Sequence, residues 1–180
     1  MNIANKLTVM RVALIPFFVF FLMNGDMWGG ASKWIAVVIF CIACATDWFD
    51  GKLARKLNLV STFGKFADPL ADKILVSSTL ICFTELGYIS SWIVIIIVAR
   101  EFIISGFRLV AAEKGKVIAA NIWGKAKTFE TMVMLIFVMM QLPWDWAYYT
   151  GQVLIYAALA LTVISLITYI VANIGIFREE

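Results

Sequence analysis

QVLIYAALALTVISLITYIVANI, residues 152–174, runs without a single charged side chain. A helix needs about 20 apolar residues to cross the hydrocarbon core of a bilayer, so this stretch is long enough to span a membrane. Five further apolar segments precede it, at about 8–23, 32–53, 66–86, 91–111 and 128–142. Six spans and their connections take up almost all of the 180 residues. We therefore expect an all-α, polytopic membrane protein of six transmembrane helices, with a single domain over residues 1–180. Residues 2–11 are expected to form a short N-terminal interfacial helix before the first span.

The composition agrees with a membrane protein and excludes several kinds of chemistry. Hydrophobic residues make up 63% of the chain and charged residues 15%, with a mean hydropathy of +0.92. Soluble domains average about 45–50% apolar and about 25% charged residues. The chain has no histidine, which excludes histidine-based triads, metal sites and proton relays. The three cysteines Cys41, Cys44 and Cys82 lie in apolar segments, and we expect them to pack rather than to form a disulfide or a zinc site. The net charge of +3 shows no stripe that would bind nucleic acid.

The basic residues give an orientation in the membrane. They gather between the second and third segments and between the fourth and fifth: Lys52, Arg55, Lys56, Lys65, Arg108, Lys114, Lys116, Lys125 and Lys127. The connections at 24–33, 86–91 and 143–151 hold one basic residue, Lys33. The positive-inside rule places the two basic connections and both termini in the cytoplasm. An aromatic belt is expected at the opposite face, from Trp28, Trp34, Trp92, Trp144, Trp146, Tyr148 and Tyr149.

Four acidic residues stand where a membrane protein rarely has them. Asp47 and Asp50 end the second apolar segment, and Asp68 and Asp72 open the third. An ionised side chain at the bilayer centre costs roughly 2.5–3.5 kcal/mol on insertion scales, so such residues suggest a function. Residues three or four apart share one helix face, and a short connection makes the two helices antiparallel neighbours. Oxygen ligands without histidine or thiolate suit Mg²⁺, Mn²⁺ or Ca²⁺, and carboxylates around two cations suggest phosphoryl chemistry.

The residues around these acids fit a substrate site. Gly51 and Ala54 lack bulk, so a substrate can approach the helix there, and Gly64 precedes Asp68 by one turn. Arg55 lies one turn beyond Gly51, where it can bind a phosphate with two hydrogen bonds. The alternative is a salt-bridge network with the neighbouring basic residues. That network would explain neither the small residues nor the spacing.

The pattern Asp47-x2-Asp50-Gly51-x2-Ala54-Arg55-x8-Gly64-x3-Asp68-x3-Asp72 resembles the complete signature of the CDP-alcohol phosphotransferases. Asn5-x2-Thr8-x2-Arg11 extends the likeness, although Ala4 stands where many members have proline. The resemblance implies that two divalent cations, Mg²⁺ or Mn²⁺, are bound by Asp47, Asp50, Asp68 and Asp72, with Asp72 also the catalytic base. It further implies a homodimer and a CDP-lipid site formed by Asn5, Thr8, Asp50, Gly51, Ala54, Arg55 and Gly64.

Three other stretches bear on the acceptor. Residues 66–73, 100–112 and 124–128 are similar to a branch of this family, the bacterial phosphatidylglycerophosphate synthases. This implies transfer of the phosphatidyl group of CDP-diacylglycerol to glycerol 3-phosphate, releasing CMP. Arg100, with Glu101 as its partner, is expected to bind the acceptor phosphate together with Arg108 and Lys125. Lys114, Lys116 and Lys127 are expected to contact lipid headgroups instead.

Three alternatives remain open at this point. Another member of the family would use a different acceptor, such as inositol phosphate, serine, choline or phosphatidylglycerol. An intramembrane prenyltransferase also uses Asp-rich helices and Mg²⁺, but it needs two well-separated acidic clusters and more spans. A divalent-cation channel or transporter is disfavoured because the chain has no internal repeat and its charges gather on one side.

Overall fold

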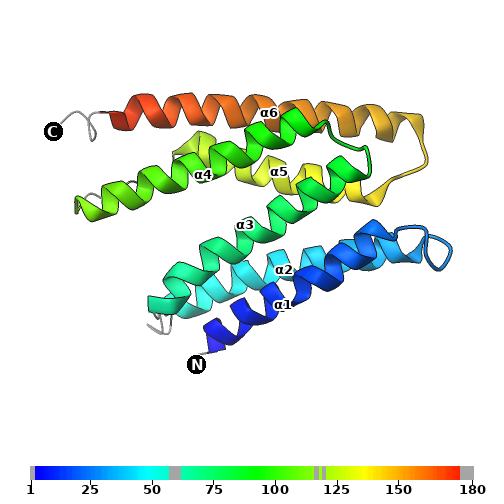
Figure 1. The fold of residues 1–180 in the computed structure, drawn as a ribbon, viewed down its shortest axis with the longest axis horizontal. Coiled ribbons are helices and arrows are strands. Elements are labelled where there is room, and N and C mark those ends of the chain that lie inside the picture. Colours follow the sequence, from blue (N-terminus) through cyan, green and yellow to red (C-terminus); the bar gives the residue numbers. More distant parts are fainter. Residues whose placement is uncertain (1–2, 57–61, 116–117, 119–120, 175–180) are drawn as a thin grey trace. The chain divides into compact units, whose positions relative to one another are not determined.

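A computed structural model describes residues 3–56, 62–115, 118 and 121–174, with the side chains of 3–7, 47–56 and 62–69 excepted. This part of the chain forms six α-helices and no strand. The helices are α1 (Ile3–Met23), α2 (Ala31–Lys56), α3 (Thr62–Glu85), α4 (Ser91–Glu113), α5 (Ile122–Met140) and α6 (Asp145–Asn173). They fall into two compact units of three helices each, Met1–Tyr88 and Ile89–Glu180 (Figure 1). The prediction of an all-α fold with six helices is confirmed.

The first helix corrects one expectation. Residues 3–23 form one continuous helix with Pro16 inside it, so the predicted interfacial helix over residues 2–11 is not a separate element. No glycine or proline interrupts the chain between Ile3 and Pro16. Thr8 and Arg11 are each only 2% exposed, whereas an interfacial helix would keep its polar side chains in water. The start of α1 is therefore part of the packed bundle.

In the first unit, α1 packs against both α2 and α3. Phe18 on α1 and Phe40 on α2 are fully buried, and their ring centroids lie 5.8 Å apart. Leu75 and Phe83 supply the buried face of α3. Near the turn between α1 and α2, the Ser32 hydroxyl donates to the Phe21 carbonyl at 2.9 Å. A packed α1 therefore connects the two helices that carry the acidic pairs.

In the second unit, α6 packs against both α4 and α5. The buried side chains include Ile97 and Ile104 on α4 and Leu135 on α5. Gly151 on α6 faces α5, since a Cβ there would lie in ordinary van der Waals contact, 3.8 Å, with the Val138 side chain. The unit therefore has a core of its own.

Glycines end two of the helices, as their positions in the sequence predict. Gly87 has φ +74° and Gly115 has φ +70°, in the left-handed region that glycine adopts at low cost. Gly87 follows α3, where the amide of Tyr88 donates to the Phe83 carbonyl at 2.8 Å. Such a bond satisfies a carbonyl at the helix end.

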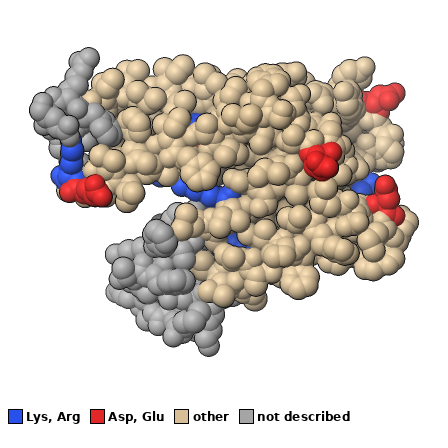
Figure 2. Space-filling view, in the orientation of Figure 1, with Lys and Arg blue, Asp and Glu red and all other residues tan. Residues whose placement is uncertain are grey.

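The exterior of the described residues is apolar. Every helix has large hydrophobic side chains that are more than a third exposed: Phe17, Val38, Ile81, Ile95, Phe129 and Val171 are examples. Most of the surface visible in Figure 2 carries no charge. Among the described residues, α6 is the one helix long and apolar enough to cross a membrane by length and composition, and shorter apolar stretches cover Thr8–Met23 and Ala31–Thr46. An apolar exterior of this kind is typical of a protein surrounded by lipid.

Candidate active site

The backbone of the first unit places the two acidic pairs at the connected ends of α2 and α3. Asp47 and Asp50 lie in the last turns of α2, and Asp68 and Asp72 lie in the first turns of α3. Both stretches are helical, so each pair shares a helix face as its spacing predicts. The two helices also contact each other. Figure 1 shows α2 and α3 meeting near these ends.

Asp72 is the one acidic residue of the four whose side chain the structure describes. It is half-buried, next to the buried Ala71 and one turn before the buried Leu75. The predicted roles of the others fall on side chains outside the described set: Asn5, Asp47, Asp50, Gly51, Ala54, Arg55, Gly64 and Asp68. Among the side chains that are described, no three metal-ligating residues form a group. The metal ligands therefore stay a prediction.

Thr8, which is predicted to contribute to a CDP-lipid site, lies on the packed face of α1. Both Thr8 and Arg11, one turn apart on α1, are buried, and α1 packs against α2 and α3. A buried guanidinium is stable only beside an anion or several hydrogen-bond acceptors. The packed face of α1 therefore brings a hydroxyl and a cation to the helices that carry the acids.

The second unit contains a buried cluster of charged side chains. One oxygen of Glu101, Oε1, accepts hydrogen bonds from Arg100 Nη1 at 2.8 Å and from Lys127 Nζ at 2.7 Å. The side chains of Arg100 and Lys127 are 7% and 3% exposed, and that of Glu101 is 24% exposed. Arg100 Nε donates to the hydroxyl of Ser165 at 3.0 Å. The predicted pairing of Arg100 with Glu101 is confirmed, and Lys127 and Ser165 are additional members.

This cluster belongs to a network that joins all three helices of the unit. Arg100 links α4 to α6 through Ser165, and Lys127 links α5 to α4 through Glu101. Asn121 links α5 to α6, since its side-chain amide donates to Thr168 Oγ1 at 3.1 Å. The side-chain oxygen of Asn121, Oδ1, also caps α5 by accepting a hydrogen bond from the Gly124 amide at 2.7 Å. Buried polar groups that are satisfied in this way fix helix positions.

The structure overturns the expectation for Lys127. We expected this ammonium to contact lipid headgroups, but the residue is 2% exposed and bonds to Glu101. Lys127 shares a helix face with the buried Thr131 and Met134, four and seven residues further on. In the sequence, this spacing is the feature that indicates burial of Lys127. The spacing does not distinguish the buried face from the lipid-facing ones, because a membrane helix is apolar on its other faces as well.

The remaining two predicted acceptor cations differ from Arg100. Lys125 and Arg108 are both exposed. Arg108 places its guanidinium 5.8 Å from the centroid of the Tyr169 ring, a cation–π contact that leaves hydrogen-bond donors available. The structure thus divides the predicted acceptor site into one buried and two exposed cations.

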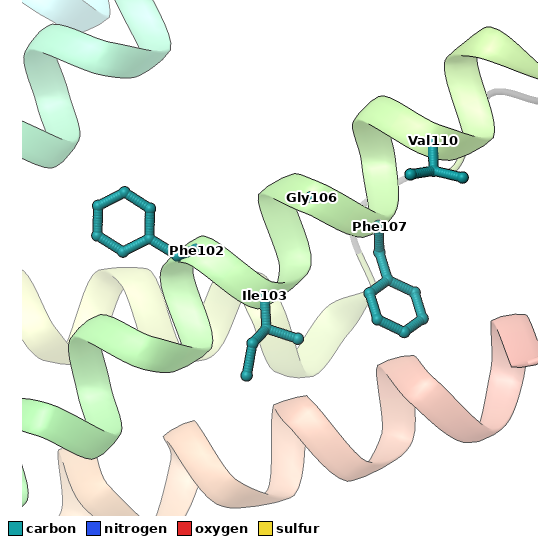
Figure 3. A pocket seen from close by; sticks show the side chains of 5 residues that line it. All are labelled: Phe102, Ile103, Gly106, Phe107 and Val110. Carbon is teal, nitrogen blue, oxygen red and sulfur yellow. The ribbon is translucent and has the colours of Figure 1, made fainter.

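An open, apolar hollow of about 450 Å³ lies along α4 (Figure 3). It is lined by Phe102, Ile103, Gly106, Phe107 and Val110. Ile103 and Phe107 point toward α6, whereas Phe102 points away from it. A Cβ on Gly106 would meet nothing within 4 Å. This lining has no charged side chain, so the hollow does not suit a phosphate.

The fold and these sites define a class: an all-α protein with a lipid-compatible exterior, acidic pairs at two helix ends and a buried basic cluster. The family model for CDP-alcohol phosphatidyltransferases matches residues 1–164. The chain therefore belongs to the CDP-alcohol phosphatidyltransferase family, and the predicted family membership is confirmed.

Relatives at 42–45% identity carry the name CDP-diacylglycerol–glycerol-3-phosphate 3-phosphatidyltransferase. The one from Bacillus subtilis (strain 168) is 45% identical over 141 residues, which cover 73% of each chain. The one from Escherichia coli (strain K12) is 42% identical over 176 residues, covering 95% of this chain and 94% of the relative. The match to the second relative thus extends over nearly the full length of both chains.

Proposed function

We propose that this protein transfers the phosphatidyl group of CDP-diacylglycerol to glycerol 3-phosphate, giving phosphatidylglycerol phosphate and CMP. The observation that carries the proposal is the complete acidic signature from Asp47 to Asp72 in a chain that belongs to the family. The printed names of relatives at 42–45% identity support the choice of acceptor.

The residues fit a pair of divalent cations. Asp47, Asp50, Asp68 and Asp72 would hold two Mg²⁺ or Mn²⁺ ions, since these four supply oxygen ligands and lie on helical backbone at spacings that share a face. When bound, the ions would neutralise the diphosphate and stabilise charge on the attacking and leaving oxygens. The chain has no histidine, which agrees with a set of hard oxygen ligands.

The protein's own residues bind the substrates and move one proton. Thr8, with Asn5, Gly51, Ala54, Arg55 and Gly64, holds the cytidine diphosphate of the donor. The acceptor hydroxyl oxygen attacks the lipid-side phosphorus, a new P–O bond forms, and the P–O bond to CMP breaks. Asp72 accepts the proton of that hydroxyl late in the step, because a carboxylate among cations is a weak base.

The basic cluster of the second unit supports an acceptor that carries its own phosphate. Arg100 and Lys127 share the single carboxylate of Glu101, so the ion-paired cluster has one more positive than negative charge. Glu130 lies one turn beyond Lys127, but its carboxylate accepts no hydrogen bond from any described residue. We propose that Arg100 binds the acceptor phosphate, with the exposed Arg108 and Lys125 attracting it from solution.

The same proposal includes the arrangement in the membrane. The six helices form six spans of one domain, with both termini and the active site on the cytoplasmic side of the cell membrane. The apolar exterior supports this arrangement, as does the family model, which extends across both compact units. Two copies of the chain form a homodimer.

The experiment is an acceptor panel with purified protein and CDP-diacylglycerol in detergent–lipid micelles. Glycerol 3-phosphate, inositol phosphate, serine, choline and phosphatidylglycerol are compared by radiolabelled product and CMP release. We expect product with glycerol 3-phosphate, loss of activity with EDTA, and recovery with Mg²⁺ or Mn²⁺. Product with a different acceptor and none with glycerol 3-phosphate would contradict the assignment. Ion flux without CMP would favour a transporter.

A further inference from the structure

The guanidinium of Arg100 is held from two sides inside the second unit. Nε donates to Ser165 on α6, and Nη1 donates to the neighbouring Glu101. Arginine has a long side chain with roughly 2 kcal/mol of rotamer entropy. Two fixed partners remove most of this freedom and therefore set the direction in which the guanidinium points.

The hydroxyl of Ser165 is oriented to accept a hydrogen bond from Arg100. The residue is fully buried, and its hydroxyl donates to the Thr162 carbonyl at 3.2 Å. A hydroxyl has one proton and two lone pairs, so this bond turns a lone pair toward Arg100 Nε. The acceptor for Nε is thus oriented before any substrate binds.

The third nitrogen, Nη2, points at the first turn of α5. A Cβ on Gly124 would lie 3.4 Å from Nη2 and 3.0 Å from Asn121 Oδ1. Glycine at this position therefore keeps the space beside Nη2 open. The end of the guanidinium consequently lies near the positive end of the α5 dipole, where an anion is favoured.

We propose that Ser165 is a positioning residue of the acceptor site: it holds Nε so that Nη2 of Arg100 is presented to the acceptor phosphate. This inference rests on the proposed function, in which Arg100 binds that phosphate. Ser165 itself touches no substrate. Its effect on the reaction passes through Arg100 alone.

The test is Ser165→Ala in the full-length protein, with initial rates measured at varied glycerol 3-phosphate and varied CDP-diacylglycerol. We expect KM for glycerol 3-phosphate to rise about tenfold, the size of one lost hydrogen bond to a charged group. KM for CDP-diacylglycerol should not change. A general loss of folded protein would instead lower kcat and leave both KM values unaltered.

Thr162→Val is the matched control. Thr162 lies on the same face of α6 and is fully buried, and its hydroxyl has no hydrogen-bond partner among the described residues. We expect both KM values to stay at the wild-type level in this variant. If Ser165→Ala does not fold, Ser165→Cys keeps the size and replaces a strong acceptor by a weak one, and KM should rise in the same direction.

A double-mutant cycle separates this inference from the proposed function. Arg100→Gln should raise KM for glycerol 3-phosphate, and adding Ser165→Ala should raise it no further. If Arg100→Gln has no effect on this KM, the assigned role of Arg100 fails and the inference with it. If Arg100→Gln raises it while Ser165→Ala does not, or if the two effects are additive, the role of Ser165 alone is wrong.

Discussion

At the scale of single residues, Glu101 is the centre of the buried cluster. Its Oε1 atom accepts hydrogen bonds from both Arg100 and Lys127. Removing the negative charge leaves two buried cations side by side without their counter-ion, which is the costly way to break a buried ion pair. The stability of the second unit therefore depends on this one carboxylate.

We predict that Glu101→Gln lowers the free energy of unfolding by about 3 kcal/mol, the lower end for a broken buried pair because Glu101 is partly exposed. Glutamine keeps the size of the side chain, so the loss reports on charge rather than packing. Thermal unfolding in detergent measures the change. Glu113→Gln, exposed on the same helix, is the control, and equal effects in the two variants would contradict the prediction.

The carboxylate of Asp72 is the proposed base for the acceptor hydroxyl. Asp72→Asn keeps the shape of the side chain but removes the proton acceptor. We expect CMP release to fall about 10²–10⁴-fold, as for the loss of a general base, while the unfolding temperature is retained. Asp26→Asn, in the exposed turn after α1, should keep full activity. A rate in Asp72→Asn equal to the wild-type rate would show that the base is another group.

At the scale of elements, α1 has two distinct faces. Phe18 is fully buried against Phe40, whereas the adjacent Phe17 is 61% exposed. The two positions have the same residue type and nearly the same depth along the helix. Substituting each position in turn therefore separates the effect of burial from the effect of removing a phenyl ring.

We predict that Phe18→Ala lowers the free energy of unfolding by about 2–3 kcal/mol through the cavity it leaves, somewhat less than in water because lipid replaces the solvent outside. Phe17→Ala should change it by far less. Denaturant unfolding followed by tryptophan fluorescence measures both. If the exposed position proves as sensitive as the buried one, the packed face of α1 is wrongly assigned.

The elements also show what the sequence can predict. Long apolar runs located all six helices, because the period and length of such runs are local properties. The separate interfacial helix was wrong, since burial of Thr8 and Arg11 depends on α2 and α3 rather than on residues 2–11. Lys127 was misassigned for a related reason. Lys125 and Lys127 have similar neighbours in sequence, and the contact with Glu101 that distinguishes them is made across two helices.

The candidate site residues also differ in how far the sequence predicts them. The spacing of Asp47, Asp50, Asp68 and Asp72 is a local helical property, so the shared faces were predictable. Ser165 was not, because nothing in an apolar helix distinguishes a serine that binds Arg100 from one that packs. Its role is visible only when α4 and α6 are placed side by side, 65 residues apart in sequence.

At the scale of the whole molecule, the distribution of charge predicts one orientation. Basic residues gather on both sides of the connections after α2 and α4, at the ends of the flanking helices or beside them: Lys52, Arg55, Lys56, Lys65, Lys114 and Lys116. The turns after α1 and α5 hold none. Positively charged connections stay in the cytoplasm. Asp26, in the turn after α1, and Asp145, the first residue of α6, should then face outward, and Lys114 should face the cytoplasm.

Thiol labelling in intact cells checks this orientation. In a variant whose three cysteines, Cys41, Cys44 and Cys82, are replaced by alanine, single cysteines are introduced as Asp26→Cys, Asp145→Cys and Lys114→Cys, all exposed positions. A membrane-impermeant maleimide should label the first two directly and Lys114→Cys only after permeabilisation. The opposite pattern would place the acidic pairs outside the cell. The proposed function places the active site on the cytoplasmic side, so that part of the proposal would fail with the topology.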